Sequence, residues 1–203
     1  LLHQAEVVEI RHMTAKEEDI LTSEALLRRG LAVDRMLQSV LVDPEVKVTD
    51  LLIGDKNALI VASRITGFGP HYGTQIGCPA CGQTVDHSFR LDDLELVDHA
   101  TLPTNVSLNE DGTFNVTLDS IDFAVQLKLL TGADEQRWTE KKDKKKKLKL
   151  PDSNVTDQLR LIITAVDGRT ESSLISQFID ACPTRASREI RAAYEAVMPK
   201  SIE

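Results

Sequence analysis

Two cysteines separated by two residues, in the segment Cys78-Pro79-Ala80-Cys81-Gly82, restrict the local fold more than any other feature of this sequence. This spacing, with a glycine directly after it, predicts a tight turn that directs both sulfurs toward one metal ion. A complete zinc ribbon needs a second pair of cysteines or histidines. The remaining cysteine, Cys182, is distant in the sequence. The site must therefore be completed by histidine, by a carboxylate, by another subunit, or not at all, and a structural module is favoured over a catalytic metal centre.

Two histidines flank the cysteine pair, giving the order His71, Cys78, Cys81 and His87. Thiolates and neutral imidazoles are common ligands of structural zinc, and metal binding would help to fold a glycine-rich segment that has little core of its own. These four residues are therefore the predicted zinc ligands. The alternative is a degenerate turn that persists without metal, because the spacing of the histidines is not a standard one. A redox role is less favoured, since a thioredoxin-type pair lies between a strand and a helix.

The chain before the cysteine pair, residues 1–66, is predicted to form an N-terminal helical lobe. A threonine followed three residues later by a glutamate has the spacing of a capping box, which predicts the start of a helix over residues 14–30. Apolar residues at helical spacing predict a second helix over 33–41 and a third over 55–67.

The middle of the chain, residues 67–130, is predicted to form a β-rich insert that contains the cysteine pair. Glycine and proline are frequent from 67 to 82. Apolar and polar residues then alternate over 85–91 and 114–118, as they do in half-buried strands, and a third strand is expected over 121–129.

The last part, residues 131–203, is predicted to be a helical region that includes a lysine-rich segment at 141–149. Helices are expected from Thr131 into the lysine-rich segment, over 155–166, over 171–179, and after Pro183. The chain is thus predicted to be an α+β protein, with a mainly helical body and a small β-rich insert that contains the Cys-x-x-Cys knuckle.

Charge is distributed unevenly along the 203 residues, because the net charge is −8 while residues 141–149 read KKDKKKKLK. A basic segment on an acidic chain predicts docking to an acidic protein surface. The predicted docking residues are Lys141, Lys142, Lys144, Lys145, Lys146 and Lys147, together with Arg185 and Arg188 at the start of the last helix. The alternative is a solvated, partly disordered segment. The overall acidity disfavours a nucleic-acid-binding protein.

Several other classes of protein are disfavoured by what the sequence contains. No nucleophile–base pair, carboxylate dyad or phosphate-binding loop is evident, so no enzymatic activity is predicted. No apolar run approaches the roughly 20 residues that span a bilayer. Residues 1–6 have neither the basic start nor the long apolar stretch of a signal peptide. Three cysteines without a disulfide framework are typical of a reducing cytoplasm.

Six segments resemble, in order, those of a known phage family. The segments are residues 13–22, 51–59, 64–69, 78–82, 129–135 and 182–191. As a set they resemble the baseplate hub subunit and hub-assembly family of T-even and related contractile-tailed bacteriophages. The last segment departs from the usual small-apolar-proline start of that family by placing Cys182 there.

The resemblance implies a structural protein of the virion tail baseplate, assembled in the host cytoplasm as part of a symmetric multi-subunit complex. Its expected partners are other baseplate and hub proteins and the tape measure protein, with no membrane span and no catalytic residue. A second hypothesis is a tail-assembly chaperone that binds the tape measure protein or the hub and then leaves. A third is a zinc-ribbon nucleic-acid-binding module, which the net charge disfavours.

Overall fold

The chain folds into two compact units. The computed structural model describes residues 7–94, 102–149, 151 and 153–198. The N-terminal unit comprises the described residues of 5–48 and 54–97, and the C-terminal unit those of 49–53 and 98–199. The 3-10 helix η1 (Val48–Asp50) spans the boundary between them in the sequence.

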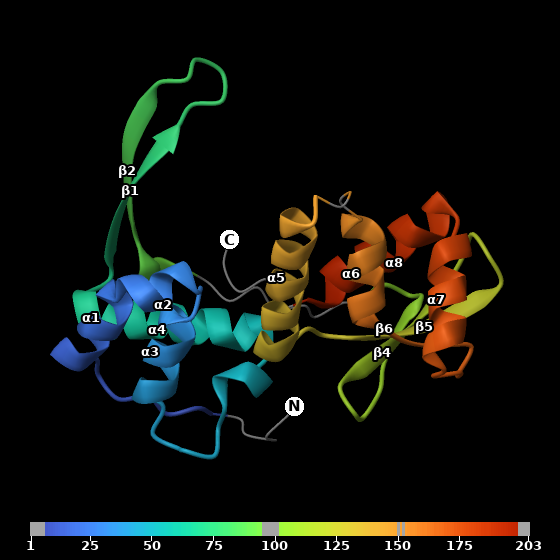
Figure 1. Cartoon of the computed structure of the whole chain (residues 1–203), viewed down its shortest axis with the longest axis horizontal. Coiled ribbons are helices and arrows are strands. Elements are labelled where there is room, and N and C mark those ends of the chain that lie inside the picture. Colours follow the sequence, from blue (N-terminus) through green and yellow to red (C-terminus); the bar gives the residue numbers. More distant parts are fainter. Residues whose placement is uncertain (1–6, 95–101, 150, 152, 199–203) are drawn as a thin grey trace. The chain divides into compact units, whose positions relative to one another are not determined.

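Four helices form the base of the N-terminal unit: α1 (Ala15–Thr22), α2 (Glu24–Arg28), α3 (Ala32–Val40) and α4 (Ile53–Phe68) (Figure 1). The helices predicted over 33–41 and 55–67 correspond to α3 and α4. The helix predicted over 14–30 is interrupted at Ser23, where an extended backbone with ψ 109° ends α1. The carbonyl of Ser23 then accepts hydrogen bonds from the amides of Leu26 and Leu27, which begins α2.

A buried carboxylate joins α1 to α3. Glu17 accepts hydrogen bonds from the amide and the hydroxyl of Thr14, each at 2.8 Å, so the predicted capping box is present. The guanidinium of Arg11 lies 2.7 Å from the same carboxylate, and the hydroxyl of Ser39 in α3 donates to it at 3.0 Å. The hydrogen bond from Arg11, with those from Thr14 and Ser39, holds the pKa of Glu17 far below its usual range despite burial.

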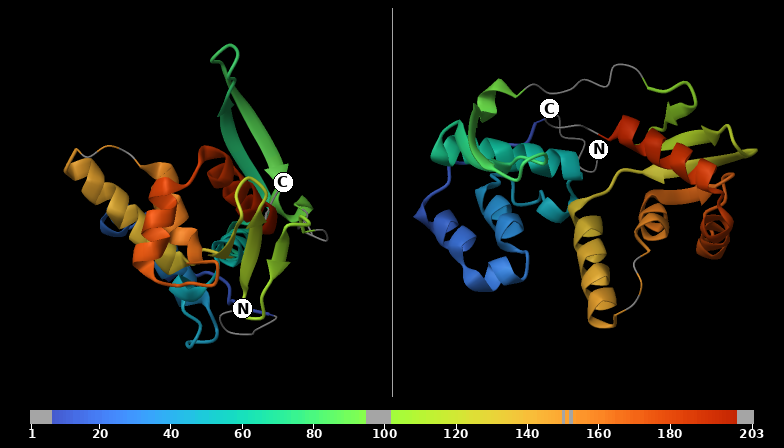
Figure 2. Two further views of the ribbon diagram at one scale, coloured as in Figure 1. Left: turned by 90° about the vertical axis from the view of Figure 1, so that its right-hand side faces the viewer. Right: turned by 90° about the horizontal axis from the view of Figure 1, so that it is seen from above.

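The N-terminal unit continues into a two-stranded antiparallel hairpin of β1 (His71–Gly77) and β2 (Thr84–Arg90), followed by the 3-10 helix η2 (Leu91–Asp93). Six of the seven residues in each strand are exposed. Figure 2 shows both strands extending away from the helices of the same unit. The hairpin therefore has almost no apolar core of its own.

The C-terminal unit contains a four-stranded antiparallel sheet in the order β3-β4-β5-β6, with helices before and after its last strand. The strands are β3 (Val106–Leu108), β4 (Thr113–Leu118), β5 (Phe123–Lys128) and β6 (Ile163–Val166). The helices are α5 (Gly132–Lys147), α6 (Asn154–Ile162), α7 (Ser172–Ala181) and α8 (Thr184–Val197).

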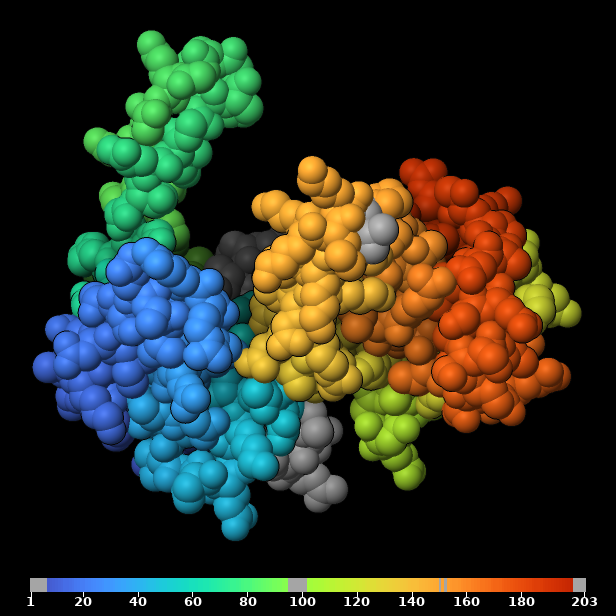
Figure 3. Space-filling model, viewed as in Figure 1, coloured from blue at the N-terminus to red at the C-terminus, as the bar shows by residue number. Residues whose placement is uncertain are grey.

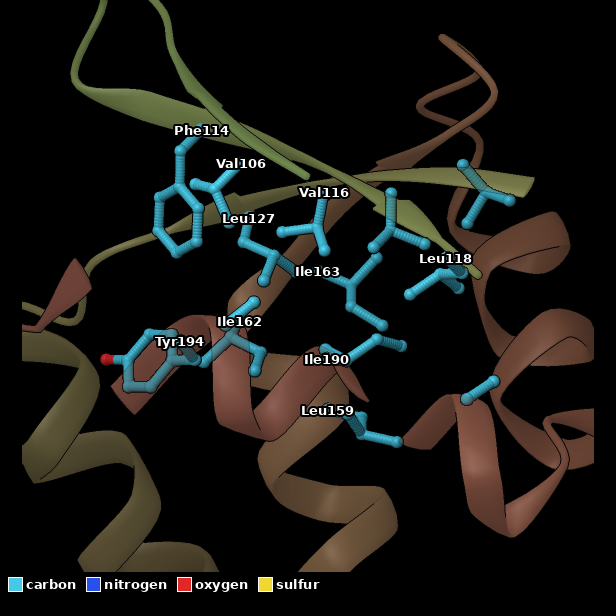
Figure 4. Packing of buried hydrophobic residues seen from close by; sticks show 14 of the residues in the cluster. Val106, Phe114, Val116, Leu118, Leu127, Leu159, Ile162, Ile163, Ile190 and Tyr194 are labelled. Carbon is cyan, nitrogen blue, oxygen red and sulfur yellow. The ribbon is translucent and has the colours of Figure 1, made fainter. Parts of the chain in front are cut away.

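One face of this sheet is buried beneath α6, α7 and α8. Phe114, Val116 and Leu118 alternate with more exposed residues in β4, and all three are buried. Figure 4 shows side chains from the strands and from the helices meeting in one cluster. Its buried members are Val106, Phe114, Val116, Leu118, Val125, Leu127, Leu159, Ile162, Ile163, Val166, Ile179, Ala186, Ile190, Ala193 and Tyr194.

The prediction of a helix over residues 155–166 is wrong for residues 163–166. The structure ends α6 at Ile162, and residues Ile163–Val166 instead form β6 at the edge of the sheet, antiparallel to β5. A short apolar run fits both helical and strand periodicity, so periodicity alone does not distinguish them. β-Branched residues and an available edge of β5 favour the strand.

The fold class is α+β, as predicted, but the strands are grouped differently from the expected insert over 67–130. The cysteine hairpin belongs to the N-terminal unit, whereas β3, β4 and β5 form a sheet with the C-terminal helices. Among the described residues, no helix is long and apolar enough to cross a membrane. Residues 1–6, in which no signal peptide was expected, lie outside the described residues.

Candidate functional site

The cysteine pair lies in the turn between β1 and β2, at the tip of the hairpin. The amide of Gly82 donates to the carbonyl of Cys78 at 2.8 Å, and the amide of Cys78 donates to the carbonyl of Gln83 at 2.8 Å. Gly82 has a φ of 70°, a conformation that glycine adopts without strain. Cys78 is partly buried, Cys81 is exposed, and both are free thiols. The turn predicted from the Cys-Pro-Ala-Cys-Gly segment is therefore present.

The same turn surrounds the sulfur of Cys78 with hydrogen-bond donors. The backbone amides of Cys81 and Ala80 lower the pKa of the Cys78 thiol, and the thiol of Cys81 contributes in the same direction. Donors of this kind stabilise the thiolate, which is the form that binds metal ions. The tip thus favours the thiolate form of Cys78.

The hairpin does not bring the two predicted histidine ligands to the cysteines. His71 pairs with Arg90 at the base of the hairpin, and His87 pairs with Thr74 part of the way along it. At about 3.3 Å per residue, His71 is roughly 20 Å from the tip along the strand. Within the described residues, no three His, Cys, Asp or Glu side chains form a group that could hold a metal ion. The described residues therefore bring only the two cysteines together, and zinc binding stays a prediction.

One face of the hairpin is apolar. Its cross-strand pairs include Tyr72 with Phe89 and Ile76 with Val85. The rings of Tyr72 and Phe89 lie 5.4 Å apart, and that of His87 lies 5.8 Å from Phe89. Ile76 is 50% exposed and Val85 is 57% exposed. This face was not predicted from the sequence, because no strand was expected over residues 71–77. The alternation of Tyr72 and Ile76 with smaller or polar residues was a usable signal.

Arg64 of α4 fastens the base of the hairpin to the helices of the same unit. Its guanidinium donates to the carbonyl of Gly69 at 2.9 Å and to that of His71 at 3.2 Å. The same group lies over the rings of Phe68 and Tyr72, 5.0 and 6.0 Å from their centroids. These contacts connect the hairpin to α4 through its base alone and leave the tip projecting (Figure 3).

Two of the predicted docking lysines have partners within the chain. Lys141 of α5 lies 2.8 Å from the carboxylate of Asp157 in α6, and Lys145 binds the other oxygen of that carboxylate. The hydroxyl of Ser153 donates to Asp157 at 2.7 Å. Burial alone would raise the pKa of Asp157, but the hydrogen bonds from Lys141, Lys145 and Ser153 hold it far below its usual range. These two lysines connect α5 to α6.

The remaining basic residues of the prediction lie on the surface. Lys142, Lys144, Lys146 and Lys147 are exposed on α5 and form no ion pair with any residue that the structure describes. On α8, Arg185 lies 3.5 Å from Glu189, one turn later, and Arg188 is exposed. The four exposed lysines of α5 and Arg188 of α8 are thus the predicted docking residues that are open to a partner.

The C-terminal unit also has an apolar hollow that sequence analysis did not identify. It measures about 610 Å³ and lies between the β5–β6 end of the sheet and α7. Its lining includes Phe123, Leu174 and Phe178, with Cys182 and Pro183 at the start of α8. Phe123 and Phe178 are in ring contact at 5.8 Å. Burial raises the pKa of the Cys182 thiol, which is partly buried.

The exposed apolar hairpin and the apolar hollow are surfaces of the kind that proteins use to dock with others. Comparisons with curated proteins and with solved structures find no match. The family described as T4 bacteriophage base plate protein matches residues 1–201, which is nearly the whole chain. The chain therefore belongs to the T4 bacteriophage base plate protein family, and its role is that of a phage baseplate protein.

Proposed function

We propose that this protein is a structural component at or near the hub of a contractile-tail baseplate, where it docks to other baseplate proteins during tail assembly in the host cytoplasm. Family membership supports a baseplate role. The proposal includes no catalytic step. The observation that supports docking most directly is the exposed apolar face of the β1–β2 hairpin.

A lone hairpin of this kind is expected to acquire its full stability only in a complex. Two-stranded hairpins are marginally stable in water, and they need a further strand or a helix packed against an apolar face. Here six of seven residues in each strand are exposed, and the apolar pairs Tyr72–Phe89 and Ile76–Val85 lie on one face. Burying such a face against a neighbouring protein would remove apolar surface from water and order the hairpin.

The charge distribution supports docking to an acidic partner surface as a second contact. Most of the chain is acidic, with a net charge of −8, whereas α5 exposes Lys142, Lys144, Lys146 and Lys147. Complementary charge across an interface mainly increases the association rate and the specificity. In this proposal the lysines orient the approaching protein and the hairpin supplies apolar contact.

A tail-assembly chaperone is the alternative function, because a protein that binds the hub or the tape measure protein only transiently would use the same surfaces. The two functions differ in whether the protein stays in the finished particle. A nucleic-acid-binding module is less favoured, because the net charge of the chain is −8.

The test is quantitative mass spectrometry of purified, DNA-filled particles, with this chain counted against a known tail protein. A fixed number of copies per particle would support the structural role. Its absence from particles, with its presence in the infected-cell lysate, would support the chaperone instead.

A second experiment tests docking through the hairpin. Phage are made that encode the double variant Ile76→Ser with Val85→Ser, and incorporation of the variant chain into particles is measured in the same way. We expect the variant chain to fold and to be lost from particles or from tail intermediates. The matched control changes Thr84→Ser and Ser88→Thr, which lie on the other face of β2. Equal incorporation of both double variants would contradict docking through the apolar face.

A further inference from the structure

We propose that Cys78 and Cys81 form one half of a four-thiolate zinc site, and that the same two cysteines of a second copy of this chain form the other half. The inference goes beyond the baseplate role and does not depend on it. It rests on the geometry of the hairpin tip, on the ligands that the described residues lack, and on the charge of the surface around the tip.

The tip has the form of a zinc knuckle. The hydrogen bonds from Gly82 to Cys78 and from Cys78 to Gln83, both at 2.8 Å, close the turn between the strands. The turn thus holds Cys78 and Cys81, three positions apart, at one end of the hairpin, which is the ligand spacing found in zinc knuckles.

The described part of this chain does not provide the other two corners. Structural zinc takes four ligands from cysteine and histidine in almost every case. His71 and His87 lie farther along the strands, paired with Arg90 and Thr74. No group of three candidate ligand side chains occurs among the described residues. A second molecule can therefore complete the coordination.

The tip is accessible to a second molecule. Cys81 and most of the residues on both strands are exposed. Figure 3 shows the hairpin projecting from the helices of its own unit, with its tip at the far end. Ligands from another chain can thus approach both sulfurs without rearrangement of the helical base.

A second copy of this chain fits the missing half for two reasons. It supplies an identical pair of thiols, which completes the Cys₄ set typical of structural zinc and gives a contact with two-fold symmetry. The tip is also free of charged side chains, since none occurs from Tyr72 to Val85 in a chain whose net charge is −8. Two acidic chains can therefore meet at this point with little repulsion between like charges.

Apolar side chains next to the tip would add to the contact. Ile76 and Val85 form the second-to-last cross-strand pair before the turn. Ile76 is 50% exposed and Val85 is 57% exposed. When two tips share a metal ion, these side chains lie close to the junction and lose exposure to water. The same step fixes the turn and stabilises a hairpin that is marginal by itself.

The experiment uses the full chain, reduced and freed of metal, and titrated with Co²⁺ and then with Zn²⁺. Mass is followed by native mass spectrometry and ligand type by the thiolate-to-cobalt absorption band. We expect about one metal ion per two chains, a dimer that forms only with metal, and an absorption intensity typical of four thiolates. EDTA should return the dimer to monomer.

Variants identify the ligands. Cys78→Ser and Cys81→Ser should each abolish the dimer and reduce bound metal at least tenfold, with an unchanged far-ultraviolet circular dichroism spectrum because the tip is exposed. Cys182→Ser is the matched control, and it should bind metal and dimerise like the unchanged chain. His71→Ala and His87→Ala should do the same.

Three results would overturn the proposal. One metal ion per monomer, lost on substitution of His71 or His87, would show that the histidines complete the site within one chain. A Cys78–Cys81 disulfide without metal affinity would show a redox pair. Metal bound by the monomer through two thiolates, without dimer formation, would show that a second copy of this chain does not complete the site.

Discussion

The two sheets of this protein have similar alternation in sequence and opposite surroundings in the structure. In β4, Phe114, Val116 and Leu118 alternate with more exposed residues and are buried beneath helices. In β1, Tyr72 and Ile76 lie on one face of the hairpin and remain exposed. Alternation in the sequence therefore predicts which side chains share a face of a sheet. Whether that face is buried depends on which other elements pack against it.

The consequence is a difference in how each sheet is stabilised. Burial of a large apolar side chain contributes about 1.5–3 kcal/mol, so the cluster around Phe114 and Ile190 stabilises the C-terminal unit from within. The hairpin has no such cluster, and it relies on the contacts of Arg64 at its base. We interpret the four-stranded sheet as part of the stable framework of the C-terminal unit, and the β1–β2 hairpin as a surface for binding another protein.

The largest loss of stability is expected when a buried side chain is removed from the sheet of the C-terminal unit. Phe114→Ala removes a fully buried ring and should lower the free energy of unfolding by about 3–5 kcal/mol. Urea unfolding, followed by the fluorescence of Trp138 in the same unit, measures the loss. The matched change in the hairpin, Val85→Ala, is followed by circular dichroism, because Trp138 lies in the other unit. It should alter stability by no more than about 0.5 kcal/mol, because Val85 is exposed. Similar losses for both would refute the contrast between the two sheets.

The helical base beneath the hairpin should depend on the buried carboxylate of Glu17. Glu17→Gln weakens the hydrogen bonds from Arg11, Thr14 and Ser39 and should cost about 2–3 kcal/mol at neutral pH. Circular dichroism of the helices during urea unfolding measures this cost. Glu18→Gln, an exposed change on the same helix, is the control and should have little effect.

The loss of stability in Glu17→Gln should depend on pH, because folding lowers the pKa of Glu17. The pKa of Glu17 is lower in the folded than in the unfolded chain, so its contribution is complete above the unfolded pKa of about 4.3 and decreases as the pH falls below it. The difference in stability between the unchanged chain and Glu17→Gln should therefore shrink from pH 5 toward pH 2. A difference that is constant over this range would show that the charge of Glu17 is unimportant.

Two neighbouring lysines of α5 should differ in their effects on stability. Lys145→Ala removes a partly buried contact with Asp157 and should cost about 1 kcal/mol, a value reduced for its partial exposure. Lys146→Ala should change stability by less than about 0.5 kcal/mol, because Lys146 is exposed. Trp138 lies beside Lys141 and Lys145, so its fluorescence reports on this site during urea unfolding. Equal costs would mean that the ion pair with Asp157 contributes nothing measurable.

Among the variants that break a contact, Arg64→Ala is expected to change global stability least, with a clear local effect. The variant loses two hydrogen bonds and its contacts with the rings of Phe68 and Tyr72, which should cost about 1 kcal/mol or less. Amide hydrogen exchange in residues 71–90 should become faster while exchange in the C-terminal unit stays unchanged. Arg28→Ala, which breaks an exposed pair with Glu24, serves as the control. Unchanged exchange in the hairpin would show that Arg64 does not hold its base.

Several features followed from short stretches of sequence because local physical chemistry determines them. The Thr14–Glu17 spacing predicted the capping box, and the apolar periodicity from Val33 to Leu41 predicted α3. The Cys-Pro-Ala-Cys-Gly segment predicted the turn at the hairpin tip, where Gly82 has a positive φ. Each depends on residues within a few positions of one another, and the α+β class and the baseplate family followed from the same sequence.

The tertiary structure decided the features that depend on distant residues. Ile163–Val166 became a strand because β5 offered an edge, and Lys141 and Lys145 became internal partners because α6 places Asp157 beside them. The strand register carried His71 and His87 away from Cys78 and Cys81, although the sequence places all four within one short segment. The physical reason is that sequence spacing limits how far apart residues can be, whereas strand pairing and burial, which involve residues far along the chain, determine where each side chain lies.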